Sequence, residues 1–160
     1  MASRRTETLA AATFAIDNWR WAGVPFVLRS GKALGGAKQE VIVTLREVPH
    51  LPTGLHGPTG PTQLRIGMKP ATLELDLIIN GEGDPFQLDR VVLASDLQAG
   101  ELIAYGEVLA GLLEGDPTLS VRGDIAEECW RIVKPVLAAW SKNEVPLESY
   151  PAGTSGPKGW

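Results

Sequence analysis

The stretch LRIGMKPATLELDLIIN at residues 64–80 carries the strongest structural signal in this 160-residue sequence. On both sides of Pro70, apolar side chains recur at every second position, which is the period of a β-strand. These positions are Leu64, Ile66, Met68, Leu73, Leu75, Leu77 and Ile79. Pro70 breaks the run, and the Asn80-Gly81-Glu82-Gly83 segment ends it. The stretch therefore predicts two strands, each with one apolar face.

Further strands are predicted on both sides of this stretch. Residues 40–46 alternate in the same way, and residues 88–94 form a further candidate strand. Nearer the start of the chain, residues 8–18 and 25–29 are joined by a short connection that contains Gly23. Glycine adopts a positive φ at little steric cost, so this connection favours a hairpin.

The last third of the sequence changes to a helical period. A first apolar stripe consists of Leu102, Tyr105, Leu109, Leu112 and Leu113. The Gly115-Asp116-Pro117 segment should end that helix. For a second helix, Asp124 is the predicted N-cap, with Glu127 three residues later, and Pro135 should bend it. Its predicted inward stripe consists of Ile125, Cys129, Val133, Val136, Leu137 and Trp140.

The order of these elements predicts the fold class. Residues 47–61 contain four prolines and three glycines, so they should form a surface loop. Strands come first and helices last, without the alternation that produces parallel sheets. We therefore expect residues 1–160 to form a single α+β domain, in which helices lie on one face of a large, mostly antiparallel sheet.

Composition limits the classes of partner. The net charge of −4, with no cluster of basic residues, argues against nucleic acid. No apolar run approaches the roughly 20 residues of a membrane span, and no secretory signal follows the first residues. The single cysteine, Cys129, can form no internal disulfide, which fits the reducing cytoplasm. Small molecules or other proteins are the expected partners, and the cytoplasm is the expected compartment.

The residues alone indicate one candidate ligand site. At residues 28–34, LRSGKAL, a strand ends in a glycine between two cations, Arg29 and Lys32. Solvated charges at a strand end are common, so both a binding site and a plain surface remain open here. His50 and His56 lie in the proline-rich loop without further metal ligands nearby in sequence, so no metal site is expected. Cys129 is expected to be a packed thiol rather than a nucleophile.

Residues 17–32, DNWRWAGVPFVLRSGK, closely resemble a pattern of the glucose-6-phosphate dehydrogenase family, in which DNWRW, GVPF and LRTGK follow in that order. Shorter segments that are similar to the family follow in family order: VPHLP at 48–52, GDPTL at 115–119, WRI at 130–132, YPAG at 150–153 and GP at 156–157. The resemblance thus covers nearly the whole chain and identifies it with the carboxy-terminal domain of that family.

This resemblance implies an activity for the family and a limited role for this chain. Members oxidise glucose 6-phosphate to 6-phosphogluconolactone with NADP or NAD, at the entry of the pentose phosphate pathway. They use a Rossmann domain and a histidine base in a RIDHYLGKE-type segment, and this sequence contains neither. The chain is therefore expected to contribute substrate binding and dimerisation, to lack catalysis by itself, and to work with a separate Rossmann-type half.

The resemblance also assigns roles to individual residues. Lys32 matches the family lysine that reaches the substrate, whereas the second substrate cation, five positions later, falls at Ala37. Arg29 and Lys38 match positions that hold a structural NADP in some members. At the position before the final GP segment many members carry arginine or tryptophan, and this chain carries Ser155. No catalytic residue and no metal ligand is expected in this chain.

Residues 54–100 depart most from the family pattern. The arginine and glutamine of a VIRVQP-like strand correspond here to Gly67 and Lys69. In the family the large sheet also forms the dimer interface, and the apolar alternation of residues 73–79 fits a homodimer. Two functions remain: the substrate-binding and dimerisation domain of a glucose-6-phosphate dehydrogenase, or a stand-alone, catalytically dead relative that acts as a scaffold or regulatory partner.

Overall fold

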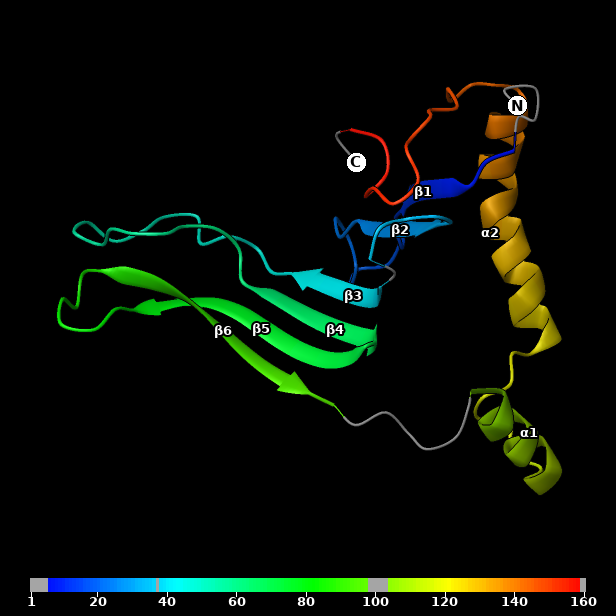
Figure 1. Ribbon diagram of the computed structural model, residues 1–160, viewed down its shortest axis with the longest axis horizontal. Coiled ribbons are helices and arrows are strands. Elements are labelled where there is room, and N and C mark those ends of the chain that lie inside the picture. The colour runs from blue at the N-terminus through cyan, green and yellow to red at the C-terminus, as the bar shows by residue number, and fades with distance from the viewer. Residues whose placement is uncertain (1–5, 37, 98–103, 159–160) are drawn as a thin grey trace. The chain divides into compact units, whose positions relative to one another are not determined.

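The computed structural model describes residues 6–36, 38–97 and 104–158. The chain divides into two compact units. The first unit combines Met1–Ala37 with Ala104–Trp160, and the second unit is Lys38–Ile103. Antiparallel strands and two helices make up the described residues (Figure 1), which confirms the predicted α+β class.

The second unit is a four-stranded antiparallel sheet. Its strands are β3 (Gln39–Thr44), β4 (Gln63–Lys69), β5 (Ala71–Asn80) and β6 (Leu88–Asp96). They lie side by side in the order of the sequence, and each strand is antiparallel to the next (Figure 1). All four strands agree with the predicted ones to within a few residues at their ends.

The pairing register separates the side chains of this sheet into two different faces. Residues paired across antiparallel strands share a face, as Arg65 and Glu74 do, and as Ile66 and Leu73 do. The apolar members of one face are Val41, Val43, Leu64, Ile66, Met68, Leu73, Leu75, Leu77, Ile79, Val91 and Leu93. The polar members of the other include Glu40, Thr44, Gln63, Arg65, Glu74, Asp76 and Arg90. Much of the apolar face is exposed in the single chain.

The proline-rich loop joins β3 to β4 and forms no helix or strand, as predicted. It is nevertheless fixed at one point, because His56 forms a single β-bridge with Gln87. The His56 N–H donates to the Phe86 carbonyl at 3.0 Å, and the Leu88 N–H donates to the His56 carbonyl at 2.8 Å. The loop therefore lies against the β5–β6 connection.

The first unit contains the predicted hairpin. Strands β1 (Leu9–Phe14) and β2 (Phe26–Gly31) pair antiparallel, and Gly23 in their connection has a φ of 75°. The ring of Trp21 packs edge-on against that of Phe26 at a centroid distance of 5.4 Å. This contact holds the connection against the start of β2.

Two helices complete the first unit: α1 (Ala104–Glu114) and α2 (Gly123–Ser141). Leu102 of the first predicted stripe lies outside the described residues. The predicted N-cap of the second helix is wrong, because Arg122 takes that position and Asp124 lies in the first turn. A carboxylate in the first turn still favours the positive end of the helix dipole. Within the described residues, neither helix is long and apolar enough to cross a membrane.

Solvent reaches more of α2 than its apolar stripe predicted. No residue of the described helix is buried, and Cys129 is exposed, so the expected packed thiol is wrong. Glu128 and Arg131 form an ion pair on this helix, with their closest atoms 2.5 Å apart. The hydrogen bond from Arg131 lowers the pKa of Glu128 and raises the pKa of Arg131. Exposed pairs of this kind add little stability.

We predict that Leu88→Ala destabilises the sheet unit. Leu88 is only 7% exposed and packs where the loop meets the sheet, so its truncation should lower the free energy of unfolding by about 2–3 kcal/mol. Urea unfolding of the whole chain measures this difference.

Leu113→Ala, on α1, is the matched control because its side chain is 89% exposed, and it should change stability by less than about 0.5 kcal/mol. Equal losses in the two variants would contradict the assignment of Leu88 to the core.

Candidate functional site

Lys32 is the first residue after β2, and its side chain is exposed. Within the described part of the chain, its ammonium takes part in no ion pair. A solvated ammonium on a flexible side chain can contact the phosphate group of a sugar phosphate as a mobile point charge. Lys32 is therefore available to a ligand, although it lines neither of two cavities that lie on the second unit.

The backbone around Lys32 is held from both sides. Its N–H donates to the Thr8 carbonyl at 2.8 Å, next to the β1–β2 ladder. Its carbonyl accepts a hydrogen bond of 2.7 Å from the hydroxyl of Tyr150. The same hydroxyl lies 3.2 Å from Thr8 Oγ1. A flexible side chain thus starts from a fixed point of the main chain.

The turn after Lys32 is tied to the same part of the chain. Ala33 has a φ of 54°, which is the left-handed region that side chains other than glycine rarely adopt. The Gly153 N–H donates to the Ala33 carbonyl at 2.8 Å, and the Gly35 N–H donates to the Thr154 carbonyl at 2.9 Å. We call residues 150–156 the C-terminal clamp, because this segment makes both contacts as well as the one from Tyr150.

Arg29 also contacts the clamp. Its guanidinium donates a hydrogen bond to the carbonyl of Ser155. Gly156 lies directly beside it, and a Cβ atom at that position would come within 2.6 Å of Arg29 Nη2 and 2.9 Å of Leu9 Cδ2. A side chain at this position would displace the ends of the Arg29 and Leu9 side chains, and the φ of 112° is one that residues other than glycine rarely adopt.

Gly31, the last residue of β2, lies where neighbouring side chains crowd its Cα. It pairs with Leu9 across the hairpin. A Cβ atom on Gly31 would lie 2.6 Å from Leu9 Cδ1 and 3.1 Å from Leu34 Cδ1. The space next to its Cα is thus filled by leucine side chains, which explains the glycine before Lys32.

Lys38 lies in the second unit, so it is described separately from Arg29 and Lys32. It lines a cavity of about 340 Å³ on the polar face of the sheet. The other lining residues are Gln63, Arg65, Glu74, Asp76 and Val92. This cavity presents cationic and anionic groups side by side.

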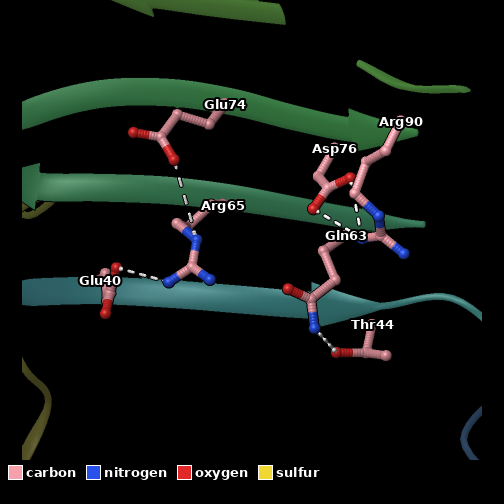
Figure 2. Close-up of polar contacts among 7 residues, drawn as sticks. All are labelled: Glu40, Thr44, Gln63, Arg65, Glu74, Asp76 and Arg90. Carbon is pink, nitrogen blue, oxygen red and sulfur yellow. Dashed lines mark hydrogen bonds and ion pairs between the residues drawn. The ribbon is translucent and has the colours of Figure 1, made fainter. Parts of the chain in front are cut away.

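The charges on this face are largely paired with one another (Figure 2). Arg65 lies between Glu40 on β3 and Glu74 on β5, with closest nitrogen–oxygen distances of 3.4 and 3.8 Å. Arg90 reaches Asp76 with Nη1, at 3.1 and 2.9 Å from the two carboxylate oxygens. Among the charged residues that line the cavity, only Lys38 takes part in no ion pair within the described ranges.

The positions at which the sequence departs from the family pattern have different surroundings. Ala37 lies outside the described residues. At Gly67, a Cβ atom would collide with Thr72 Oγ1 and lie 2.6 Å from the Pro70 carbonyl oxygen. An arginine at Gly67 therefore does not fit this backbone with Thr72 in place. Ser155 takes part in the clamp through its carbonyl, not its side chain.

Metal ligands do not gather in the part of the chain that the structure describes, where no group of three His, Cys, Asp or Glu residues lies close enough to hold an ion. The Nδ1–H of His56 donates to the Gly54 carbonyl at 3.1 Å, and its Nε2 lies 3.7 Å from Asp84. These contacts fasten the proline-rich loop.

The fold and the site define an α+β domain that offers an exposed lysine on a fixed turn, together with a sheet whose faces differ sharply in polarity. Residues 1–160 match the model of the family described as glucose-6-phosphate dehydrogenase, C-terminal domain. The chain therefore belongs to that family.

Full-length relatives agree with this assignment. The chain is 37% identical over 160 residues to the glucose-6-phosphate 1-dehydrogenase of Mycolicibacterium smegmatis, with 96% of this chain and 32% of the relative covered. It is 39% identical over 169 residues to the enzyme of Treponema pallidum, with 96% and 31% covered. The chain thus spans about one third of the length of these relatives.

Solved structures show the same fold. A glucose-6-phosphate 1-dehydrogenase from Mycobacterium avium superposes with a TM-score of 0.78 at 37% identity, over 96% of this chain and 32% of that one. A glucose-6-phosphate dehydrogenase in complex with its substrate glucose-6-phosphate gives a TM-score of 0.77 at 28% identity, over 95% and 32%. The family resemblance found in the sequence is confirmed.

Sequence reasoning missed the clamp and the ion-pair network. Tyr150 and Thr8 are 142 residues apart, and no local pattern links them. The alternation of β4 and β5 did contain a signal for the network, because Arg65, Glu74 and Asp76 all occupy positions opposite to the apolar ones. Only the register shows that Arg65 faces Glu74 directly.

We predict that Gly156→Ala loosens the clamp. An alanine with a φ of 112° that also meets Arg29 and Leu9 should lower the free energy of unfolding by about 1–3 kcal/mol. Urea unfolding, followed by the fluorescence of the first unit, measures this difference.

The control is Gly106→Ala in α1, where a Cβ atom meets nothing within 4 Å and alanine should add about 0.5–1 kcal/mol. A Gly156→Ala protein as stable as the starting chain would show that the clamp does not pack as described.

Proposed function

We propose that this chain is the substrate-binding and dimerisation domain of a glucose-6-phosphate 1-dehydrogenase. The observation that carries the proposal is Lys32: it lies on a fixed turn, is exposed, and matches the family lysine that reaches the substrate. The substrate complex known for a similar dehydrogenase supports glucose 6-phosphate as the ligand class. The hydride transfer itself would take place on a Rossmann-type half, with NADP bound mainly there.

A contact between Lys32 and a phosphate has a definite energetic scale. A charge-assisted hydrogen bond contributes about 1.5–3 kcal/mol, which alone supports no better than millimolar affinity. The chain by itself should therefore bind glucose 6-phosphate weakly. In the complete enzyme the same contact would lower the Michaelis constant, since the second half supplies the remaining contacts.

A structural NADP at Arg29 and Lys38 has uneven support. Lys38 lines a cavity with a second cation, Arg65, which favours an anionic ligand. Glu74 and Asp76 line the same cavity and oppose one. Arg29 is already engaged with the Ser155 carbonyl. We therefore assign Lys38 a contact with a nucleotide phosphate and Arg29 a mainly structural role.

Dimerisation is proposed through the four-stranded sheet. Its apolar face carries side chains that remain exposed in the single chain, among them Met68 and Leu93 at 59% and 58%. Contiguous apolar surface of this kind marks an interaction site in soluble proteins. The cytoplasm remains our expectation for the compartment, although a relative from Spinacia oleracea is named as chloroplastic.

The alternative is a stand-alone, catalytically dead relative that acts as a scaffold. The departures from the family pattern favour it, above all Gly67, where the backbone leaves no room for a side chain. The two functions differ in one property that can be measured, because a scaffold does not need Lys32 to bind sugar phosphate.

We predict that Lys32→Ala abolishes the weak binding of glucose 6-phosphate to the chain while the fold stays intact. Joined to a complementary Rossmann half, the variant should show a Michaelis constant raised by about tenfold to a hundredfold, the loss expected for one charge-assisted hydrogen bond. NMR titration of the chain with glucose 6-phosphate, and with glucose as the ligand that lacks phosphate, measures the first effect.

Lys142→Ala is the matched control, because Lys142 is an exposed lysine paired with Glu144 at 3.9 Å. It should leave both measurements unchanged. If Lys32→Ala also leaves them unchanged, Lys32 is a solvated surface charge and the scaffold function is preferred.

We also predict that the chain forms a homodimer at tens of micromolar. Leu93→Lys and Val92→Lys place the same charge on neighbouring residues of β6 that belong to opposite faces. Sedimentation should show that Leu93→Lys, on the apolar face, dissociates the dimer because a buried unpaired ammonium is costly, whereas Val92→Lys leaves the dimer intact. A strictly monomeric starting chain would contradict dimerisation through the sheet.

A further inference from the structure

We propose that Tyr150 is a positioning residue for Lys32, and that the C-terminal clamp serves to aim this lysine at its ligand. The inference rests on the proposed function of Lys32 and extends it to a part of the chain 118 residues away in sequence. It follows from the hydrogen bonds that converge on the two peptide groups next to the Lys32 Cα.

Both of these peptide groups are fixed. The Lys32 N–H belongs to the first and donates to the Thr8 carbonyl at 2.8 Å. The Lys32 carbonyl belongs to the second and accepts from the Tyr150 hydroxyl at 2.7 Å. Fixing the peptide planes on both sides of a Cα fixes its φ and ψ, and with them the direction of the Cα–Cβ bond. Only the torsions of the side chain itself then remain free.

The proton arrangement at Tyr150 follows from the partners. A carbonyl oxygen can only accept, so the single hydroxyl proton of Tyr150 goes to Lys32. The Thr8 hydroxyl, 3.2 Å away, must therefore donate to the Tyr150 oxygen. Thr8 thus acts on Lys32 twice, directly through its carbonyl and indirectly through the bond from its hydroxyl to Tyr150. The chain of bonds Thr8–Tyr150–Lys32 joins the start of β1 to the end of β2.

The clamp continues past Lys32. Ala33 has an unfavourable φ of 54°, and the Gly153 N–H holds its carbonyl at 2.8 Å. A strained residue next to a proposed ligand contact persists only where the surroundings hold it in place. Pre-positioning a lysine in this way reduces the conformational entropy that ligand binding must otherwise remove.

The experiment uses the complete 160-residue chain and the variant Tyr150→Phe, which removes one hydroxyl. NMR of the free protein reads the Lys32 carbonyl carbon and the Ala33 amide, which belong to the same peptide group. Both signals should move when the hydrogen bond is lost. Titration should then show affinity for glucose 6-phosphate weakened by about twofold to tenfold, the range that one neutral hydrogen bond covers.

Tyr105→Phe is the matched control, because Tyr105 is the other tyrosine of the chain and is 83% exposed on α1. It should change neither the signals of Lys32 nor the affinity. Thr8→Val is a second variant that keeps the Tyr150–Lys32 bond but removes the donor to Tyr150, so it should act in the same direction and less strongly. Thr8→Val still tests the inference if Tyr150→Phe destabilises the fold too strongly for the titration.

Two outcomes overturn the inference in distinguishable ways. If Lys32→Ala weakens binding but Tyr150→Phe and Thr8→Val leave the affinity unchanged, the clamp only fastens the chain terminus and Tyr150 has no positioning role. If Lys32→Ala itself leaves binding unchanged, the proposed function of Lys32 is wrong and its positioning falls with it.

Discussion

The antiparallel register between β4 and β5 is the constraint on which the second unit depends. Because Arg65 lies opposite Glu74 and Ile66 lies opposite Leu73, the charged side chains of these strands are directed to one face and the large apolar ones, apart from Ile78, to the other. A shift by one residue would exchange the two faces and place carboxylates among leucines. Pairing with β3 and β6 extends the two faces across the sheet, although Ile42 and Val92 lie on the polar face and Asp89 lies on the apolar one.

The ion pairs of the polar face fix the positions of side chains more than they add to the free energy of unfolding. Each pair lies at a half-exposed surface, where solvent screens the attraction and single pairs contribute about 0–1 kcal/mol. Their effect is geometric: Arg65 bridges three strands, and the Arg90 guanidinium also donates to the Thr59 carbonyl at 3.2 Å, which ties the proline-rich loop to β6. The apolar face carries several side chains that remain exposed, among them Met68 and Leu93.

The packing of the first unit depends on two glycines. Gly31 and Gly156 lie where leucine and arginine side chains fill the space that a Cβ would occupy. Segments from the two ends of the chain can therefore pack around the turn that carries Lys32. For the role that we propose for Lys32, this arrangement would set the direction of the cation before the ligand arrives.

The sequence by itself determined the elements and the family. The two-residue period of residues 64–79, the change to a helical period after residue 100 and the DNWRW to LRSGK run are local patterns, and local patterns survive without knowledge of contacts. They predicted the strands, the hairpin, the α+β class and Lys32 as the candidate residue. They failed at the start of α2, where Arg122 rather than Asp124 is the N-cap, and at Cys129, because amphipathic spacing alone does not say whether a stripe is covered. The tertiary structure decided which residues meet: Thr8 with Tyr150, Arg29 with Ser155, and Arg65 with both Glu40 and Glu74. These contacts depend on chain segments up to 142 residues apart, and their geometry is fixed by strand register and turn conformation, which no periodicity in the sequence records.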